Sequence, residues 1–191
     1  MSGRRAERLQ VQRRNLLARA LEQAEREGLA ALVPEALARS EGLPLRSLGP
    51  EPEDLFFPDE DDLRSAFAAV LDHAGLLEAV MAWARHLQEE GELWRRRLAL
   101  TAREPLLRLR RVALDEAWRG MLADHFARWG AAGPAGERVA ALEAELTLAA
   151  LRGAERRWVE GGGRPQLPVL AHEALAQLWP ALYAHARRSG R

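Results

Sequence analysis

Residues 137–160 read ERVAALEAELTLAALRGAERRWVE, and the spacing of their apolar residues decides the fold class. These residues recur at steps of three and four, which places them on one face of a helix. They are Val139, Leu142, Leu146, Ala149, Ala150 and Gly153. The later positions are small, and small side chains let a second helix approach closely. The stretch therefore predicts a long helix with one face suited to another helix.

A second helix is expected over residues 168–187, after the Gly161–Gly163 stop and the prolines at 165 and 168. Two apolar helices joined by a short loop form an antiparallel pair. Such a pair at the end of an all-helical chain often meets its own copy across a two-fold axis. The alternative is that both helices complete the core of a single chain. The predicted dimer contact consists of Leu146, Ala149, Ala150, Gly153, Leu175, Leu178 and Leu182.

The rest of the chain shows further helical periodicity and no two-residue alternation typical of a strand. Glycine and proline mark the expected boundaries, and residues 49–58, which carry three prolines, are expected to form a loop. The fold class is therefore predicted to be all-α with about nine helices. The other seven are expected over residues 4–27, 32–40, 44–48, 59–73, 76–89, 93–100 and 106–129.

Composition excludes several classes of function. The chain has 191 residues, no net charge and no cysteine, so neither global basicity nor thiol chemistry is available. No apolar run is long enough to span a membrane, and the N-terminus lacks the apolar region of a signal peptide, so a soluble cytoplasmic protein is expected. The five histidines lack metal-ligand spacing and no phosphate-binding glycine loop is present. We therefore expect no enzyme, cofactor or metal.

Several segments, in this order, resemble the TetR family of transcriptional regulators. In the N-terminal third they are NLLARAL at 15–21, EGL at 27–29, GLPLRSL at 42–48 and FPDEDDL at 57–63. Further on they are REPLLRLR at 103–110, RRW at 156–158 and LWPAL at 178–182. The resemblance implies a helix-turn-helix DNA-binding-like domain over residues 1–58. It implies a ligand-binding and dimerisation domain over residues 59–191.

The resemblance also implies a mechanism. The two DNA-binding-like domains of a homodimer would bind DNA half-sites about one helical turn apart. A small hydrophobic ligand would change the spacing of the heads and release the DNA, as in a repressor. Arg46 and Ser47 are the expected base or phosphate contacts, because arginine can bind guanine through two hydrogen bonds. The alternative is that Arg46 is a solvated surface side chain. Arg4, Arg5 and Arg8 could lie on the same side.

Aromatic, methionine and histidine side chains in the middle helices are typical of a pocket for a small hydrophobic ligand. His86 or His125 could supply its polar group. The alternative is that these tryptophans are ordinary core residues. The candidate pocket residues are Met81, Trp83, His86, Trp94, Trp118, Met121, His125 and Phe126.

The N-terminal DNA-binding-like region departs from the family in its net charge. Residues 1–47 contain nine Arg and six Glu, whereas residues 48–62 contain seven acids and no base. The net charge over residues 1–62 is therefore −4. Carboxylates near phosphates weaken DNA binding. The runner-up hypothesis is accordingly a TetR-fold protein with a degenerate head, acting as a lipid-, small-molecule- or partner-binding module.

Overall fold

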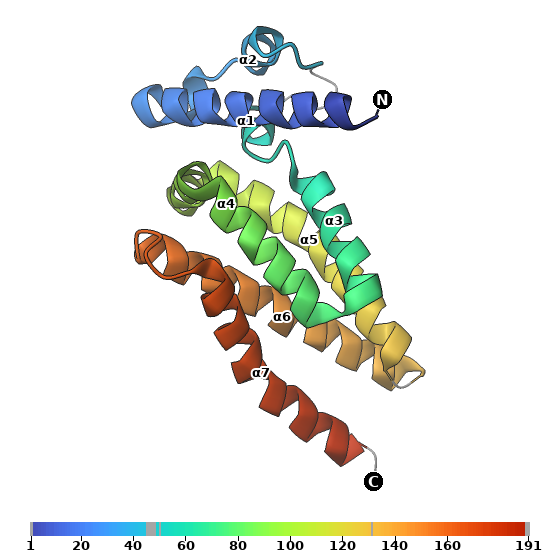
Figure 1. Cartoon of the computed structure of the whole chain (residues 1–191). Coiled ribbons are helices and arrows are strands. Elements are labelled where there is room, and N and C mark those ends of the chain that lie inside the picture. Colours follow the sequence, from blue (N-terminus) through green and yellow to red (C-terminus); the bar gives the residue numbers. More distant parts are fainter. Residues whose placement is uncertain (1, 45–48, 50, 131, 190–191) are drawn as a thin grey trace. The chain divides into compact units, whose positions relative to one another are not determined.

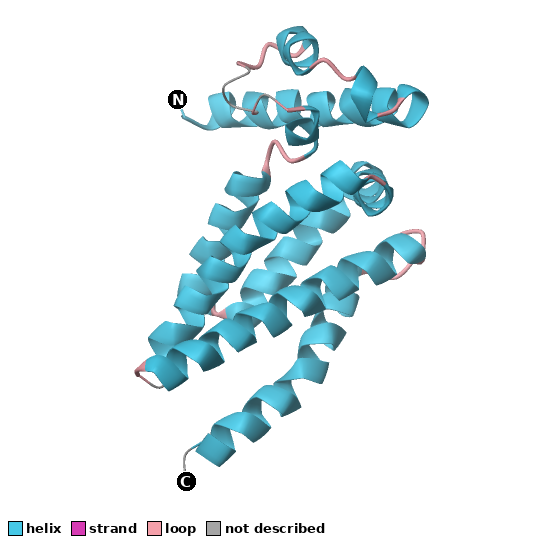
Figure 2. Ribbon diagram, turned by 180° about the vertical axis from the view of Figure 1, so that it is seen from behind, coloured by secondary structure: helices cyan, strands magenta, loops and turns pink. Residues whose placement is uncertain are grey.

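The computed structural model describes residues 2–44, 49, 51–130 and 132–189, and the side chains of residues 8–178 within those ranges. The described residues form helices and turns without a strand, so the all-α prediction is confirmed (Figures 1 and 2). The α-helices are α1 (Ser2–Glu27), α2 (Pro34–Ser40), α3 (Glu60–Ala74), α4 (Leu76–Arg103), α5 (Pro105–Trp129), α6 (Pro134–Glu160) and α7 (Leu167–Ser189). The described residues also form the 3-10 helices η1 (Leu29–Ala31) and η3 (Pro52–Phe56).

The described residues contain seven α-helices, where about nine were predicted. The helices predicted over 76–89 and 93–100 both lie within α4, where two helical stretches meet at a kink. The kink is at Gly91, the predicted boundary, whose backbone is not helical, with φ 55° and ψ −115°. Glycine lacks a Cβ and so adopts this backbone without strain. The predicted helix at 44–48 falls largely on residues 45–48, which lie outside the described residues.

The predicted loop at 49–58 was also wrong in part, because it contains η3. Pro52 stands in the first turn of η3, where its missing N–H costs nothing. Glu51 and Asp54 cap the turn reciprocally, and the Glu51 N–H donates to Asp54 Oδ2 at 3.2 Å. A capping box can therefore form a helical turn even in a proline-rich acidic segment.

The chain forms two compact units. The first, here called the head unit, consists of residues 1–63 and 95–111. In it α1 packs against η1, α2 and η3, and its core includes Leu16, Ala20, Leu21, Leu55 and Phe56. The buried α1 residues recur at helical spacing, so one apolar face of α1 organises the unit.

The second unit, here called the bundle unit, consists of residues 64–94 and 112–191. Its core includes Trp83, Trp94, Trp118 and Trp158, and α6 packs closely on α7. The helix predicted over 137–160 is α6, and the one predicted over 168–187 is α7. Among the described residues, no helix combines the length and apolar character that crossing a membrane requires.

Candidate functional site

The head unit contains the start of the predicted helix-turn-helix, but not all of its predicted contact residues can be located. Arg46 and Ser47 lie outside the described residues. Arg4 and Arg5 belong to α1, and their side chains lie outside the described ones, whereas Arg8 is exposed on α1. Contact of these residues with DNA therefore stays a prediction.

The acidic segment of the head unit is paired internally with arginine. Asp54 forms an ion pair with Arg110 of α5, with 3.0 Å between Asp54 Oδ1 and Arg110 Nε. Only 9% of the Asp54 side chain is exposed. Asp62 at the start of α3 pairs with Arg13 of α1. The Asp54 carboxylate is thus held against protein, whereas Asp62 stays largely exposed within its ion pair. The sequence-based view of the segment as unfavourable to DNA did not include such partners.

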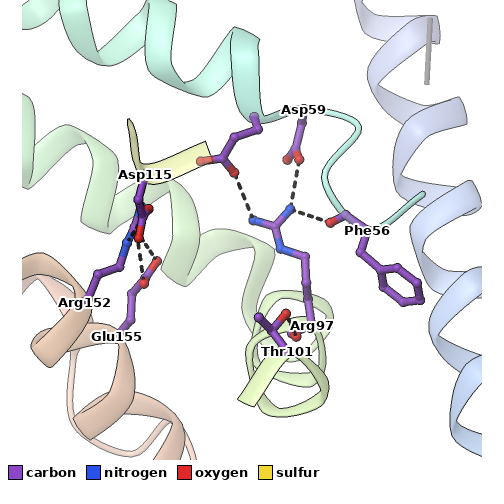
Figure 3. A network of polar contacts seen from close by, with 8 residues as sticks. Phe56, Asp59, Arg97, Thr101, Asp115, Arg152 and Glu155 are labelled. Atoms are coloured by element: carbon purple, nitrogen blue, oxygen red, sulfur yellow. Dashed lines mark hydrogen bonds and ion pairs between the residues drawn. The ribbon is translucent and has the colours of Figure 1, made fainter. Parts of the chain in front are cut away.

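Arg97 of α4 contacts several residues of the acidic segment (Figure 3). It is completely buried. Its Nη1 donates to Asp59 Oδ1 at 2.9 Å and to the Phe56 carbonyl at 3.2 Å. Its Nη2 lies 4.0 Å from Glu60 Oε2, and its guanidinium carbon lies 5.4 Å from the Phe57 ring centroid. A planar guanidinium suits this set of carbonyl, carboxylate and aromatic contacts. Arg97 thus anchors the junction between η3 and α3.

The net charge of the head unit differs from that of residues 1–62 alone. Residues 95–111 contain seven Arg and one Glu, so the head unit contains sixteen Arg and fourteen acids. Its net charge is therefore +2, compared with −4 for residues 1–62 alone. Sequence reasoning missed Arg97 and Arg110, although the complementary runs Arg95–Arg97 and Asp59–Asp62 gave a signal for pairing.

The predicted pocket residues divide by burial. Trp83, Trp94 and Trp118 are buried, and Trp118 meets Phe67 edge-on at 5.1 Å between ring centroids. The half-buried ones are Met81, Met121, His125 and Phe126, and His86 is exposed. The three tryptophans therefore belong to the bundle core, and His86 is not brought into it.

His125, one of the predicted pocket residues, has a lowered pKa. Burial lowers the pKa of His125 below its ordinary value, the charge of Arg128 acts in the same direction, and Asp72 opposes both. Its ring lies 5.6 Å from the Phe126 ring in an edge-on arrangement, and its Nδ1 is buried without a hydrogen-bond partner. The environment therefore favours the neutral imidazole.

A polar cluster that sequence reasoning missed lies between α5 and α6 (Figure 3). Arg152 donates to Asp115 Oδ1 at 2.6 and 3.1 Å, and to both oxygens of Glu155 at 3.1 and 3.2 Å. Its guanidinium carbon lies 5.9 Å from the Trp118 ring centroid. Thr147 and Trp158 of α6 also bury a polar atom without a hydrogen-bond partner. Small-molecule sites combine apolar surface with a few polar groups of this kind, so the cluster is a candidate for the polar part of a ligand site.

The face of α6 that carries the predicted dimer contact is not the face buried in the chain. The buried face consists of Ala140, Ala144, Thr147, Leu148, Leu151, Ala154, Glu155 and Trp158. On the predicted face Leu142 is 54% exposed and Ala149 is exposed, while Leu146, Ala150 and Gly153 are half-buried. In α7, Leu175 is buried within its own chain, Leu178 is half-buried, and the Leu182 side chain lies outside the described ones. Leu175 therefore has little surface left for a partner.

Comparison with known proteins gives one family match. The family model described as the MftR C-terminal domain, a TetR-type domain, matches residues 72–183, which is more than half of the chain. The match covers most of the bundle unit and leaves residues 1–71 outside it. No curated protein matches the sequence.

Proposed function

Because the chain belongs to the TetR family of transcriptional regulators, we propose that it is a ligand-responsive regulator that binds DNA as a homodimer. The observation that carries the proposal is the match over residues 72–183, a C-terminal TetR-type domain. The internal pairing of Asp54 and Asp59 adds support, because it weakens the objection that the acids of residues 48–62 repel DNA. Ligand binding by the bundle unit would control release of DNA.

The exposed face of α6 supports a dimer contact through α6 and α7. A Cβ at Gly153 would meet nothing within 4 Å in its own chain, so the first atom of a larger side chain fits the single chain there. In a dimer that brings α6 helices together at this point, the added bulk would block the close approach. Gly153→Leu should therefore shift the protein towards monomer in size-exclusion chromatography with light scattering. Ala141→Leu, on another face of α6, is the matched control. An unchanged Gly153→Leu dimer would remove this contact from the proposal.

The bundle unit supports binding of a small hydrophobic ligand. Its buried tryptophans supply apolar surface, and the cluster of Asp115, Arg152 and Glu155 supplies polar groups beside Trp118. Native mass spectrometry of the purified protein should detect a retained small molecule or a gain in mass on adding candidate ligands. Thermal unfolding should shift upward with ligand concentration, because a ligand that binds only the folded state stabilises it.

DNA binding is tested by fluorescence anisotropy with the DNA that flanks the protein's own gene. Phosphate contacts release counterions, so affinity should fall steeply as salt concentration rises. Arg46→Ala should abolish sequence-specific binding. Arg26→Ala is the matched control, because Arg26 is exposed and already paired with Glu27 at 2.7 Å. Specific binding that survives Arg46→Ala would show that the reading residue was wrongly chosen.

The same measurements separate the alternative function. A TetR-fold module with a degenerate head would show no specific DNA binding even at low salt, yet would retain a ligand in native mass spectrometry. The pairing of Asp54 and Asp59 with arginine counts against that alternative, because neither carboxylate is an unpaired negative charge.

A further inference from the structure

The Asp54 carboxylate of η3 contacts two other parts of the head unit at once. Its Oδ1 lies 3.0 Å from Arg110 Nε, and its Oδ2 accepts a hydrogen bond from the Glu51 N–H at 3.2 Å. All three residues belong to the head unit, although Arg110 lies far along the sequence in α5. A carboxylate with little exposure is stable where it is both paired and hydrogen-bonded, and Asp54 is both.

Gly49 brings the preceding backbone against the same carboxylate. Its φ is 95°, in the left-handed region that favours glycine. A Cβ at Gly49 would overlap Asp54 Oδ2, so a side chain there would displace the carboxylate. The predicted DNA contacts Arg46 and Ser47 precede Gly49 by three and two residues in the sequence. The chain that follows these two residues is therefore held where it meets Asp54.

Apolar contacts attach the same turn to α1. Leu55 and Phe56, which follow Asp54 in the sequence, are completely buried, and η3 packs against α1. The Asp54 N–H donates to the Glu51 carbonyl at 3.0 Å, and the Phe57 N–H donates to the Asp54 carbonyl at 3.2 Å. The turn thus has an apolar attachment to α1 and a polar attachment to α5. Asp54 supplies the polar attachment.

We propose that Asp54, held by Arg110, is a positioning residue for DNA binding by the head unit and not a charge that repels DNA. The inference rests on the proposed function, because it requires that the head unit binds DNA. An acid exposed towards phosphates weakens binding, so its removal strengthens binding. An acid that holds the chain in its binding conformation acts in the opposite way, because its removal frees a segment that must be ordered in the complex. The two roles therefore predict changes in affinity of opposite sign.

Fluorescence anisotropy of the full chain with the DNA that flanks its gene measures this sign. Asp54→Ala should raise the dissociation constant for specific DNA by about tenfold, because a hydrogen bond to a charged group and an ion pair are both lost. Asp54→Asn keeps an oxygen for the Glu51 N–H and should raise the constant by less. Glu53→Ala is the matched control, because it removes the same charge from a half-buried position of the same turn. This control should leave the constant unchanged or lower it.

A double-variant comparison tests whether Arg110 acts through Asp54. Arg110→Met should weaken specific binding, and the double variant Arg110→Met with Asp54→Ala should bind no more weakly than Asp54→Ala alone, because both changes remove the same contact. If Arg110 contacted phosphate instead, the two losses would add. The slope of log affinity against log salt would then also fall by about 0.9. Arg110→Lys keeps the charge and should recover part of the affinity that Arg110→Met loses.

Hydrogen exchange followed by mass spectrometry, without DNA, reports on the segment itself. In Asp54→Ala, peptides covering residues 49–57 should exchange faster than in the parent, whereas peptides of α6 should not change. Circular dichroism confirms that each variant is folded, and Asp54→Asn takes the place of Asp54→Ala if the latter is not.

Three results would each overturn the inference while leaving the proposed function in place. Asp54→Ala could bind specific DNA as tightly as the parent or more tightly, the Asp54 and Arg110 losses could add, or exchange over residues 49–57 could stay unchanged. A parent chain that binds no specific DNA would refute the proposed function, and the role of Asp54 with it.

Discussion

Replacing the buried Arg97 should destabilise the head unit more than any exposed arginine does. In Arg97→Met, two hydrogen bonds disappear, one to a carbonyl and one to the Asp59 carboxylate. Glu60, which is only 2% exposed, also loses a guanidinium 4.0 Å away. Removing one partner of a buried charge pair typically costs about 3–5 kcal/mol, because the remaining charge stays buried. We expect a loss in that range for Arg97→Met.

Two companion variants separate the contributions. Arg97→Lys keeps the charge but loses the planar fork that reaches Asp59 and the Phe56 carbonyl together, so a loss of about 1–2 kcal/mol is expected. Adding Asp59→Asn and Glu60→Gln to Arg97→Met removes the uncompensated charges and should recover at least about half of the loss. Arg85→Met, at an exposed position of α4, should stay within about 0.5 kcal/mol of the parent.

Urea unfolding, followed by both tryptophan fluorescence and circular dichroism, measures these differences as changes in the free energy of unfolding. The slope of the unfolding curve must remain unchanged, because a change would indicate an altered unfolded state. A loss of less than about 1 kcal/mol in Arg97→Met would refute the reasoning, since exposed ion pairs lie in that range. Failure of the neutralised triple variant to recover would show that packing, rather than charge, is what Arg97 contributes.

Three further predictions concern the bundle unit and the kink. Gly91→Ala should lower the free energy of unfolding in urea by about 1–3 kcal/mol, because it forces a residue with a Cβ to φ 55°. Gly120→Ala, at a helical position, should instead raise it by about 0.5–1 kcal/mol. Arg152→Met should lower the free energy of unfolding by about 2–3 kcal/mol, because its partner Glu155 is only 4% exposed and would be left buried without it. Arg157→Met should lower it by under about 1 kcal/mol, because the ion pair of Arg157 with Glu173 is exposed. The folded-state pKa of His125 lies below the unfolded one, so its contribution to stability is full above the unfolded pKa and is lost as pH falls through both values. His125→Gln should therefore lose less stability than the parent between about pH 8 and about pH 5, with His172→Gln as the exposed control.

The periodicity of the sequence predicted most helices because burial of one face is a local property of the chain. It also marked a boundary at Gly91, and this is the non-helical residue of α4, where two helical stretches meet at a kink. The turn after the kink contains Trp94 and Arg97, which are buried. That burial comes from residues distant in sequence, so a local pattern did not reveal it.

Charge was harder to interpret from the sequence than apolar periodicity. Counted with their neighbours in sequence, the acids between Glu51 and Asp62 are unfavourable to DNA binding. Their partners, however, include Arg97 and Arg110, which lie about 40 and about 55 residues further along the chain. Ion pairs act through space, so the sequence shows only that two runs of opposite sign exist. The cluster around Arg152 was missed for the same reason, because Asp115 lies on another helix.

The arrangement of these features bears on how a ligand could influence DNA binding in the proposed regulator. Helices α3, α4 and α5 each contribute residues to both compact units, so they provide continuous connections from one unit to the other. The kink at Gly91 falls just before Arg95, where the part of α4 in the head unit begins. Beyond the kink, Arg97 ties α4 to Asp59 at the start of α3. We therefore expect the C-terminal part of α4 to move together with the η3–α3 junction. A change in the backbone angles of Gly91 would allow this movement without an equal movement of the first half of α4.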